Sequence, residues 1–306
     1  MRQILGALIG LLLVCLVLQH TGIDRVGQAL WSASVYFPVI LLFELGFWVF
    51  GALSQRALYG KQRNLIPWPA VLKAGCTAYA IMGLMPMGRV IAESARAVIF
   101  SKYVGKHQAA LVAVQVQIVA LLVTSFVGLL AAFVLMAKLG LLFFTWLALL
   151  NALAALALGT LALLAAKHFK IGRKLGLFLP KVQVFGERFD AYFINTRVLP
   201  LWPMIFEGLS RTSQVIQNGF LVLAVGGALG VVPAFCSEAM HLMGATLGDL
   251  IPGQLGVTEL VYSEAGTVLS LNPEDALSIA LLAHLAQLFW VIVALVLPIV
   301  FRFDRR

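Results

Sequence analysis

The feature that most restricts this chain is the recurrence of apolar runs long enough to cross a bilayer. A hydrocarbon core about 30 Å thick needs roughly 20 apolar residues of helix. Because a spanning helix satisfies its own backbone hydrogen bonds, such runs favour an all-α fold. The composition agrees, with 61% hydrophobic and 11% charged residues and a mean hydropathy of +0.98. The sequence predicts a polytopic membrane helix bundle, a single domain over residues 1–306 without a soluble module.

The runs predict about six spans, at 4–20, 33–53, 109–137, 141–166, 200–224 and 276–301. We interpret 4–20 as a retained span rather than a signal peptide, because only Arg2 flanks it and no cleavage pattern follows. Two further stretches, 67–104 and 231–272, are interrupted by Pro and Gly and continue as more polar segments. Non-helical backbone at membrane depth must be shielded by protein or line a cavity. Both stretches are therefore predicted to be re-entrant helical hairpins.

The distribution of charge predicts the orientation. With the N-terminus inside, every Lys and Arg except Arg25, Lys138 and Arg211 falls on the cytoplasmic side, including those of a basic loop at 167–199. Cytoplasmic loops of membrane proteins carry this excess. The region 212–301 has no Lys or Arg but six acidic residues, which fits a second hairpin that faces outward. We expect both termini in the cytoplasm.

The two interrupted stretches also resemble each other. A shift of 166 positions aligns Pro86 with Pro252 and Glu93 with Glu259. Three predicted spans separate the hairpins, so the second copy, at about 200–301, enters from the opposite side to the first, at about 33–137. Inverted repeats with broken helices are common in transporters. The alternative is chance similarity between two Gly- and Pro-interrupted apolar segments.

Several carboxylates are predicted to lie at membrane depth. Glu93 and Glu259 follow their prolines by seven residues, about two turns into the helix after each break. Glu44 stands alone in the second span. Charged groups in the bilayer are costly, so each is a candidate for substrate binding. The alternative for Glu93 and Glu259 is that they cap backbone amides freed by the break.

A polar stripe crosses the span at 200–224. Glu207 and Arg211 are four residues apart and are expected to pair on one helical face, which Gln214 and Asn218 continue. Such a face must look into the bundle or a wet cavity. We expect it to line a cavity, and the alternative is polar contact between packed helices.

Two arginines, Arg89 and Arg96, share one face of the first hairpin's second arm. Guanidinium groups bind phosphate in a bidentate manner, and a neighbouring helix N-terminus favours an anion. Together they are predicted to hold a lipid phosphate. The alternative is that they only follow the positive-inside rule.

The sequence shows no arrangement that indicates an enzyme, a metal site or a cofactor. Cys15, Cys76 and Cys236 lie in apolar surroundings without metal-ligand spacing. The five histidines are scattered, and the Gly208-Leu209-Ser210 triplet has no base fixed beside the serine. The basic loop is expected to attract anionic lipid head groups and not nucleic acid.

The run Pro252-Gly253-Gln254-Leu255-Gly256-Val257-Thr258-Glu259, with Pro86-Met87-Gly88-Arg89 leading to Glu93-Ser94-Ala95-Arg96, resembles the transmembrane region of lysylphosphatidylglycerol synthetases and related flippase-like membrane proteins. The resemblance covers about 35–302 and departs at Met87, where a second glycine is missing. It implies movement of a lipid between leaflets of the bacterial cytoplasmic membrane, in a stand-alone form without the synthase domain. Stand-alone members accompany hopanoid or polyprenyl-linked pathways.

We therefore expect a non-enzymatic lipid translocase. Its substrate would be an anionic or aminoacyl phospholipid, or a hopanoid or polyprenyl lipid, and a second copy or lipid-synthesis enzymes are candidate partners. The predicted substrate-binding residues are Arg89, Glu93, Arg96, Glu44, Glu207, Arg211, Gln214, Pro252, Gly253, Gly256 and Glu259. The alternatives are a membrane-embedded enzyme of lipid or isoprenoid metabolism and a non-catalytic scaffold of a lipid-synthesis complex.

Overall fold

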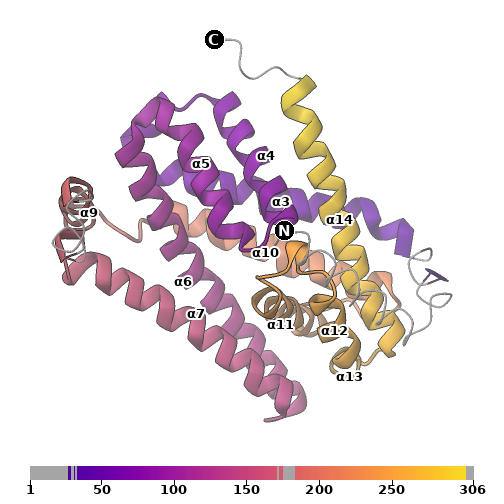
Figure 1. Ribbon diagram of the computed structural model, residues 1–306. Helices are drawn as coiled ribbons and strands as arrows, with labels where there is room; N and C mark the ends of the chain where they lie inside the picture. Colours follow the sequence, from indigo (N-terminus) through magenta and orange to yellow (C-terminus); the bar gives the residue numbers. More distant parts are fainter. Residues whose placement is uncertain (1–26, 29–30, 32, 171, 175–182, 301–306) are drawn as a thin grey trace.

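The computed structural model describes residues 27–28, 31, 33–170, 172–174 and 183–300. Every element over these residues is a helix, which confirms the predicted all-α class (Figure 1). The predicted first span, 4–20, lies outside the described residues. The elements are η1 (Ser34–Tyr36), α3 (Phe37–Leu58), η2 (Gly60–Leu65), α4 (Trp68–Leu84), α5 (Gly88–Val104), α6 (Lys106–Leu139), α7 (Phe143–His168), α9 (Gln183–Asn195), α10 (Leu201–Ala224), α11 (Val231–Leu247), η4 (Pro252–Gln254), α12 (Val257–Glu264), α13 (Gly266–Leu269) and α14 (Pro273–Val300).

Four segments of the described chain are long and apolar enough to cross a membrane. They are Ser34–Leu58, Lys106–Leu139, Phe143–His168 and Pro273–Pro298, close to four of the predicted spans. The helix expected at 200–224 is present as α10, but it does not belong to this group. Charged and polar side chains on one face of α10 lower its hydropathy. The bundle is thus a polytopic membrane fold in which α10 is more polar than the four long apolar helices.

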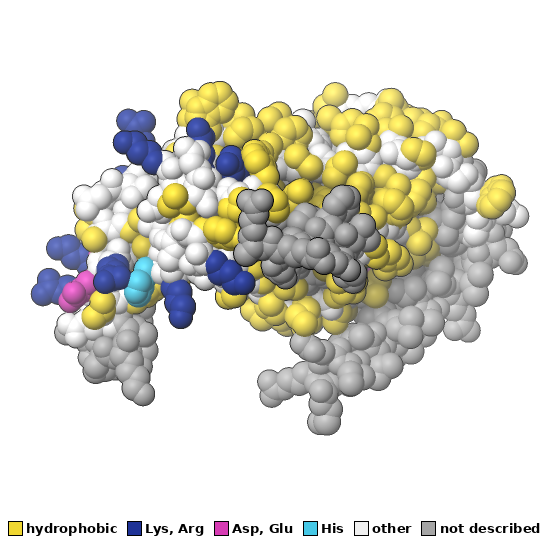
Figure 2. All heavy atoms as spheres, turned by 90° about the horizontal axis from the view of Figure 1, so that it is seen from above, with side chains coloured by type: hydrophobic (Ala, Val, Ile, Leu, Met, Phe, Trp, Pro, Cys, Tyr) yellow, Lys and Arg dark blue, Asp and Glu magenta, His cyan; other side chains and the backbone are white. Residues whose placement is uncertain are grey.

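The outer surface carries the apolar side chains that a lipid environment requires. On α7, Leu150 and Leu161 are exposed, and on α14 Leu288 and Ile292 are exposed. Figure 2 shows hydrophobic side chains over much of one face, with Lys and Arg gathered toward one end. Apolar surface of this extent indicates contact with a membrane or another protein. Here the lengths of the helices favour the membrane.

Helices α3 and α10 pack closely because small residues face each other. A Cβ on Gly46 would lie 2.9 Å from Oγ of Ser213. Ser210 Oγ donates a hydrogen bond to the carbonyl oxygen of Phe47 at 2.7 Å. Small residues and interhelical hydrogen bonds of this kind hold helices together in membranes. The hydrophobic effect does not drive helices together there, because the lipid is as apolar as the helix surface. The polar α10 is thereby fixed inside the bundle.

Both interrupted stretches form helical hairpins, and their tips touch. α4 packs on α5, and α11 packs on α12. The backbone N–H of Met87 donates to the carbonyl oxygen of Asp249 at 2.7 Å. A Cβ on Gly253 would lie 3.0 Å from the carbonyl oxygen of Gly83. The two breaks therefore meet backbone to backbone, while their re-entrant placement in the membrane stays a prediction.

The two halves contain the same order of elements: a long helix, a broken hairpin and another long helix. α3, α4, α5 and α6 correspond to α10, α11, α12 with α13, and α14. The contacts are reciprocal, because α4 packs on α14, α11 packs on α6, and α3 packs on α10. Two copies related by a two-fold axis would make these contacts. The repeat and its inverted membrane orientation both stay predictions.

The second break is longer than the first. α5 begins at Gly88, directly after Met87, whose φ is 54°. In the second half, positive φ angles at Gly253, Gln254 and Gly256 delay the start of α12 to Val257. Glu93 is consequently well inside α5, whereas Glu259 lies in the first turn of α12. The expectation of two turns of helix before each carboxylate was wrong for the second copy.

The predicted basic loop at 167–199 contains the short helix α9. Phe193 is fully buried against α6 and α7. The Asp190 carboxylate accepts backbone hydrogen bonds from Gly172 at 2.9 Å and Arg173 at 2.8 Å. Helix α9 is therefore packed against the bundle.

Candidate functional site

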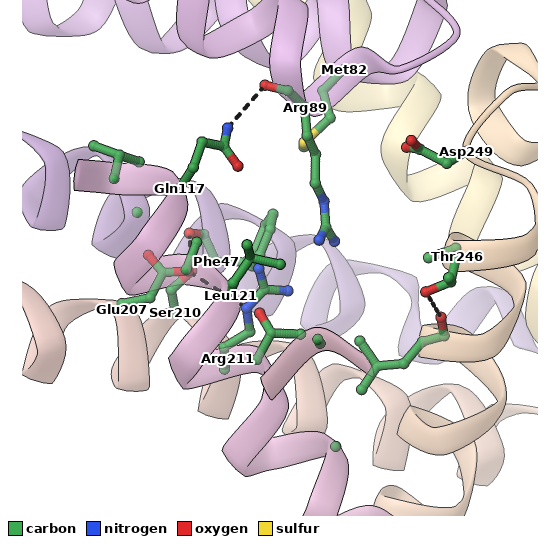
Figure 3. A pocket seen from close by; sticks show the side chains of 18 of the residues that line it. Phe47, Met82, Arg89, Gln117, Leu121, Glu207, Ser210, Arg211, Thr246 and Asp249 are labelled. Atoms are coloured by element: carbon green, nitrogen blue, oxygen red, sulfur yellow. Dashed lines mark hydrogen bonds and ion pairs between the residues drawn. The ribbon is translucent and has the colours of Figure 1, made fainter. Parts of the chain in front are cut away.

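A cavity of about 490 Å³ lies between the first hairpin and the first arm of the second. Side chains from α3, α4, α5, α6, α7, α10 and α11 line it (Figure 3). Much of its wall is apolar, but ionisable and polar groups from helices far apart in sequence converge on it. The polar lining residues are Arg89, Glu93, Arg96, Gln117, Thr124, Asn151, Glu207, Ser210, Arg211, Thr246 and Asp249.

Glu93 and Arg96 form an ion pair one turn apart on α5. Glu93 is 8% exposed, and its other carboxylate oxygen accepts a hydrogen bond from Gln55 Nε2 at 2.9 Å. Glu93 therefore bonds side chains of α3 and α5 and does not cap the helix N-terminus. The positive charge of Arg96 is balanced locally, which makes it a weaker phosphate ligand than its sequence position indicates.

Glu207 and Arg211 form the expected pair on α10, with 3.6 Å between Arg211 Nε and Glu207 Oε1. Arg211 is 3% exposed and donates from Nη1 to Gln214 Oε1 at 3.0 Å. Its guanidinium also lies over the Phe47 ring, 5.4 Å from the ring centroid. These partners hold Arg211 in a fixed position at the cavity wall.

The polar stripe on α10 divides between the two roles considered for it. Glu207 and Arg211 line the cavity, whereas Gln214 and Asn218 are not among the lining residues. Gln214 Nε2 lies 2.9 Å from Nε2 of His241, and Asn218 Nδ2 donates to Glu238 at 2.6 Å. The C-terminal part of the stripe, Gln214 and Asn218, thus joins α10 to α11.

Arg89 and Asp249 face the cavity from the two hairpins. Arg89 lies in the first turn of α5 and extends into the cavity, and Asp249 follows α11 (Figure 3). Gln117 Nε2 donates to the backbone oxygen of Arg89 at 3.5 Å. Within the described parts of the chain, neither the Arg89 guanidinium nor the Asp249 carboxylate forms an ion pair. These are the two charged lining groups that remain unpaired.

Glu259 is fully buried but is not among the lining residues. Its Oε2 accepts the backbone N–H of Gly256, the N-cap residue of α12, at 2.8 Å, and its Oε1 lies 3.4 Å from His284 Nε2. This geometry fits the alternative of capping freed backbone amides. Pro252, Gly253 and Gly256 also lie outside the lining and form the break that contacts the first hairpin.

Glu44 likewise bonds within the bundle. It accepts hydrogen bonds from the Tyr79 hydroxyl and from Gln217 Nε2, the latter at 2.7 Å. It therefore links α3 to α4 and α10, and it is not among the cavity-lining residues. Tyr79 itself lines the cavity, so Glu44 is hydrogen-bonded to a lining residue.

Two replacements of Glu259 separate a capping role from a need for charge. Glutamine can also accept the Gly256 N–H through its side-chain oxygen, so Glu259→Gln should change the free energy of unfolding little. Glu259→Ala removes the cap and should lower the free energy of unfolding by about 1 kcal/mol. Thermal unfolding of the purified protein in detergent measures both. Equal destabilisation by the two variants would contradict the capping role.

The enzyme-like Gly208-Leu209-Ser210 triplet has no base beside it in the described structure. Ser210 Oγ donates to a backbone carbonyl of α3. His241 lies against Gln214, and His284 lies against Glu259. Ser210 therefore serves helix packing and contributes a polar group to the cavity.

Sequence reasoning missed Asp249 as a cavity residue, as well as Gln117, Asn151, Ser210 and Thr246. A signal was present for Asn151, which is an amide in the middle of the mostly apolar α7. A signal was also present for Asp249, an acidic residue just before the second break. The packing that brings α7 and α11 close to α5 could not be predicted from the sequence.

The sequence model described as the lysylphosphatidylglycerol synthase TM region matches residues 3–295, nearly the whole chain. Comparisons with curated proteins and with solved structures gave no match.

Proposed function

Because the chain belongs to the family of the lysylphosphatidylglycerol synthase transmembrane region, we propose that it is a lipid translocase. It moves a phospholipid or related amphiphile between the leaflets of the bacterial cytoplasmic membrane. The head group passes through the cavity between the hairpins, and the acyl chains stay in the lipid.

The observation that carries this proposal is a charged cavity inside an apolar bundle. Three arginines and three carboxylates line the cavity in the described structure, namely Arg89, Arg96, Arg211, Glu93, Glu207 and Asp249. Charged groups within a membrane are costly and usually mark a pathway for a polar substrate. A volume in the lower half of the roughly 300–1,000 Å³ range of small-molecule sites suits a lipid head group.

The rim of the cavity supports a route to the lipid phase. Val90 of α5 and Leu158 of α7 are among the lining residues, yet they are 54% and 61% exposed. In a bilayer these side chains would contact acyl chains. A lipid whose tails lie along this apolar rim can place its head group among the charged residues inside.

The contact between the two hairpin tips supports a means of alternating access. In many transporters, broken helices from two repeats meet at the substrate site, and one repeat rocks against the other. Here the Met87 to Asp249 hydrogen bond joins the breaks beside the cavity. Movement of one hairpin relative to the other would change which side of the cavity is open.

The alternatives make different predictions. A membrane-embedded enzyme of lipid or isoprenoid metabolism would convert its substrate in detergent. A scaffold of a lipid-synthesis complex would neither convert nor move lipid, and the charged cavity lining would have no role. The absence of a base beside Ser210 among the described residues favours translocation over hydrolysis.

Reconstitution into liposomes tests the proposal. Purified protein is inserted into vesicles that contain traces of phospholipid labelled on an acyl chain, and dithionite bleaches the label of the outer leaflet. We expect bleaching of inner-leaflet label in proportion to the protein content. A rate equal to that of protein-free vesicles, across anionic and amine-bearing phospholipids, would show that the protein is not a lipid translocase.

A further inference from the structure

The charged residues of the cavity do not all have the same freedom to bind a ligand. Arg96 is paired with Glu93, and Arg211 is paired with Glu207. Arg89 and Asp249 remain, and no ion pair joins either of them to another residue that the structure describes. The cavity therefore presents one unpaired cation and one unpaired anion.

These two groups belong to different hairpins, and the backbone fixes their relative position. The backbone carbonyl oxygen of Asp249 accepts the N–H of Met87, two residues before Arg89, at 2.7 Å. Figure 3 shows both side chains directed into the same space, with Thr246 on the side of Asp249. Two opposite charges held apart in one cavity are complementary to a ligand that carries both charges.

The surroundings of Arg89 favour an anion at its guanidinium. Arg89 lies in the first turn of α5, a helix of 17 residues whose N-terminus adds a favourable dipole. Arg211 lines the same cavity but is paired with Glu207, so Arg89 is the unpaired cation that an anion would meet there. A planar guanidinium can bind two phosphate oxygens at once.

We propose that the cavity selects phospholipids whose head group carries one phosphate and one ammonium, with no net charge. Arg89 binds the phosphate, and Asp249 binds the ammonium. This inference rests on the proposed function and names its substrate class. It assigns Asp249, on the second hairpin, as the residue that distinguishes amine-bearing from amine-free head groups.

Other head groups leave a charge unmatched. An anionic head group without an amine would satisfy Arg89 but leave the Asp249 carboxylate without a partner in a partly desolvated site. A head group with two ammonium groups would leave the second one without an unpaired carboxylate, since Glu207 and Glu93 are already paired. Unpaired charges and like-charge contacts are a common source of specificity.

The test compares three acyl-chain-labelled lipids in the dithionite assay: phosphatidylethanolamine, phosphatidylglycerol and lysylphosphatidylglycerol. The wild-type protein should move phosphatidylethanolamine fastest. Asp249→Asn should slow phosphatidylethanolamine about tenfold, equivalent to about 1.4 kcal/mol, and leave phosphatidylglycerol unchanged or faster. Arg89→Gln should slow both of these lipids by a similar factor.

Controls separate specificity from folding. Asp249→Asn retains the backbone carbonyl that accepts from Met87, so its thermal unfolding should match that of the wild type. Asp249→Glu keeps the charge and should restore part of the preference for phosphatidylethanolamine.

The outcomes separate this inference from the proposed function. Equal slowing of phosphatidylethanolamine and phosphatidylglycerol by Asp249→Asn, or a wild-type preference for either of the other two lipids, would overturn the inference while the translocase function stands. Failure of the wild type to move any of the three would overturn both.

Discussion

Replacing Gly88 with alanine should lower the free energy of unfolding by about 3 kcal/mol, the upper part of the range for overpacked sites. A Cβ at Gly88 would lie 2.6 Å from the carbonyl oxygen of Met82 and 2.8 Å from its Cα. These are backbone atoms of α4, so no side-chain rotation relieves the overlap. The tip of the first hairpin would have to open, and Arg89 would move with it.

Thermal unfolding in detergent, combined with the dithionite assay, measures this effect. Gly208→Ala is a matched control, because Gly208 lies inside α10 and a Cβ there meets nothing within 4 Å. The control should be neutral or slightly stabilising, since alanine favours helix more than glycine does. If Gly88→Ala unfolds at the wild-type temperature, the close approach of α4 and α5 is not as described.

Much of the fold follows from the sequence because bilayer thickness and backbone hydrogen bonding leave few choices. Length and hydropathy alone were enough to predict α3, α6, α7 and α14 as spans. Pro86 and Pro252 located the two breaks, because proline cannot continue a helix without losing a hydrogen bond. The elements of the bundle were therefore predictable without knowledge of their packing.

The conformation of the breaks was not predictable in the same way. Glu93 and Glu259 share one sequence register, yet they have different roles because α12 begins later than α5 relative to its proline. The delay depends on positive φ angles that include Gln254, and Met87 adopts a left-handed conformation that usually requires glycine. When residues other than glycine, such as Met87 and Gln254, adopt positive φ angles, the sequence gives no clear signal of it.

The charge pairing inside the cavity was predictable only in part. The spacing of Glu207 and Arg211 predicted their contact on one helix. The hydrogen bond from Gln55 to Glu93 and the position of Asp249 opposite Arg89 depend on contacts between helices distant in sequence. Local periodicity could not reveal them, and for this reason Arg96 seemed as available as Arg89.

Filling the cavity should stop lipid movement without unfolding the protein. Ala155 of α7 lines the cavity, and tryptophan at this position would occupy the space that the head group needs. Ala157 lies on the same helix, is exposed and is not a lining residue. Tryptophan at position 157 would contact lipid and leave the cavity open, so the two variants add the same side chain to opposite sides of one helix.

The most direct measurement of the central claim compares Ala155→Trp with Ala157→Trp in the dithionite assay, at equal protein content and with thermal unfolding checked for both. We predict that Ala155→Trp reduces the bleaching of inner-leaflet label to the rate of protein-free vesicles, while Ala157→Trp retains the wild-type rate. Equal, wild-type rates for both variants would contradict passage of the head group through this cavity.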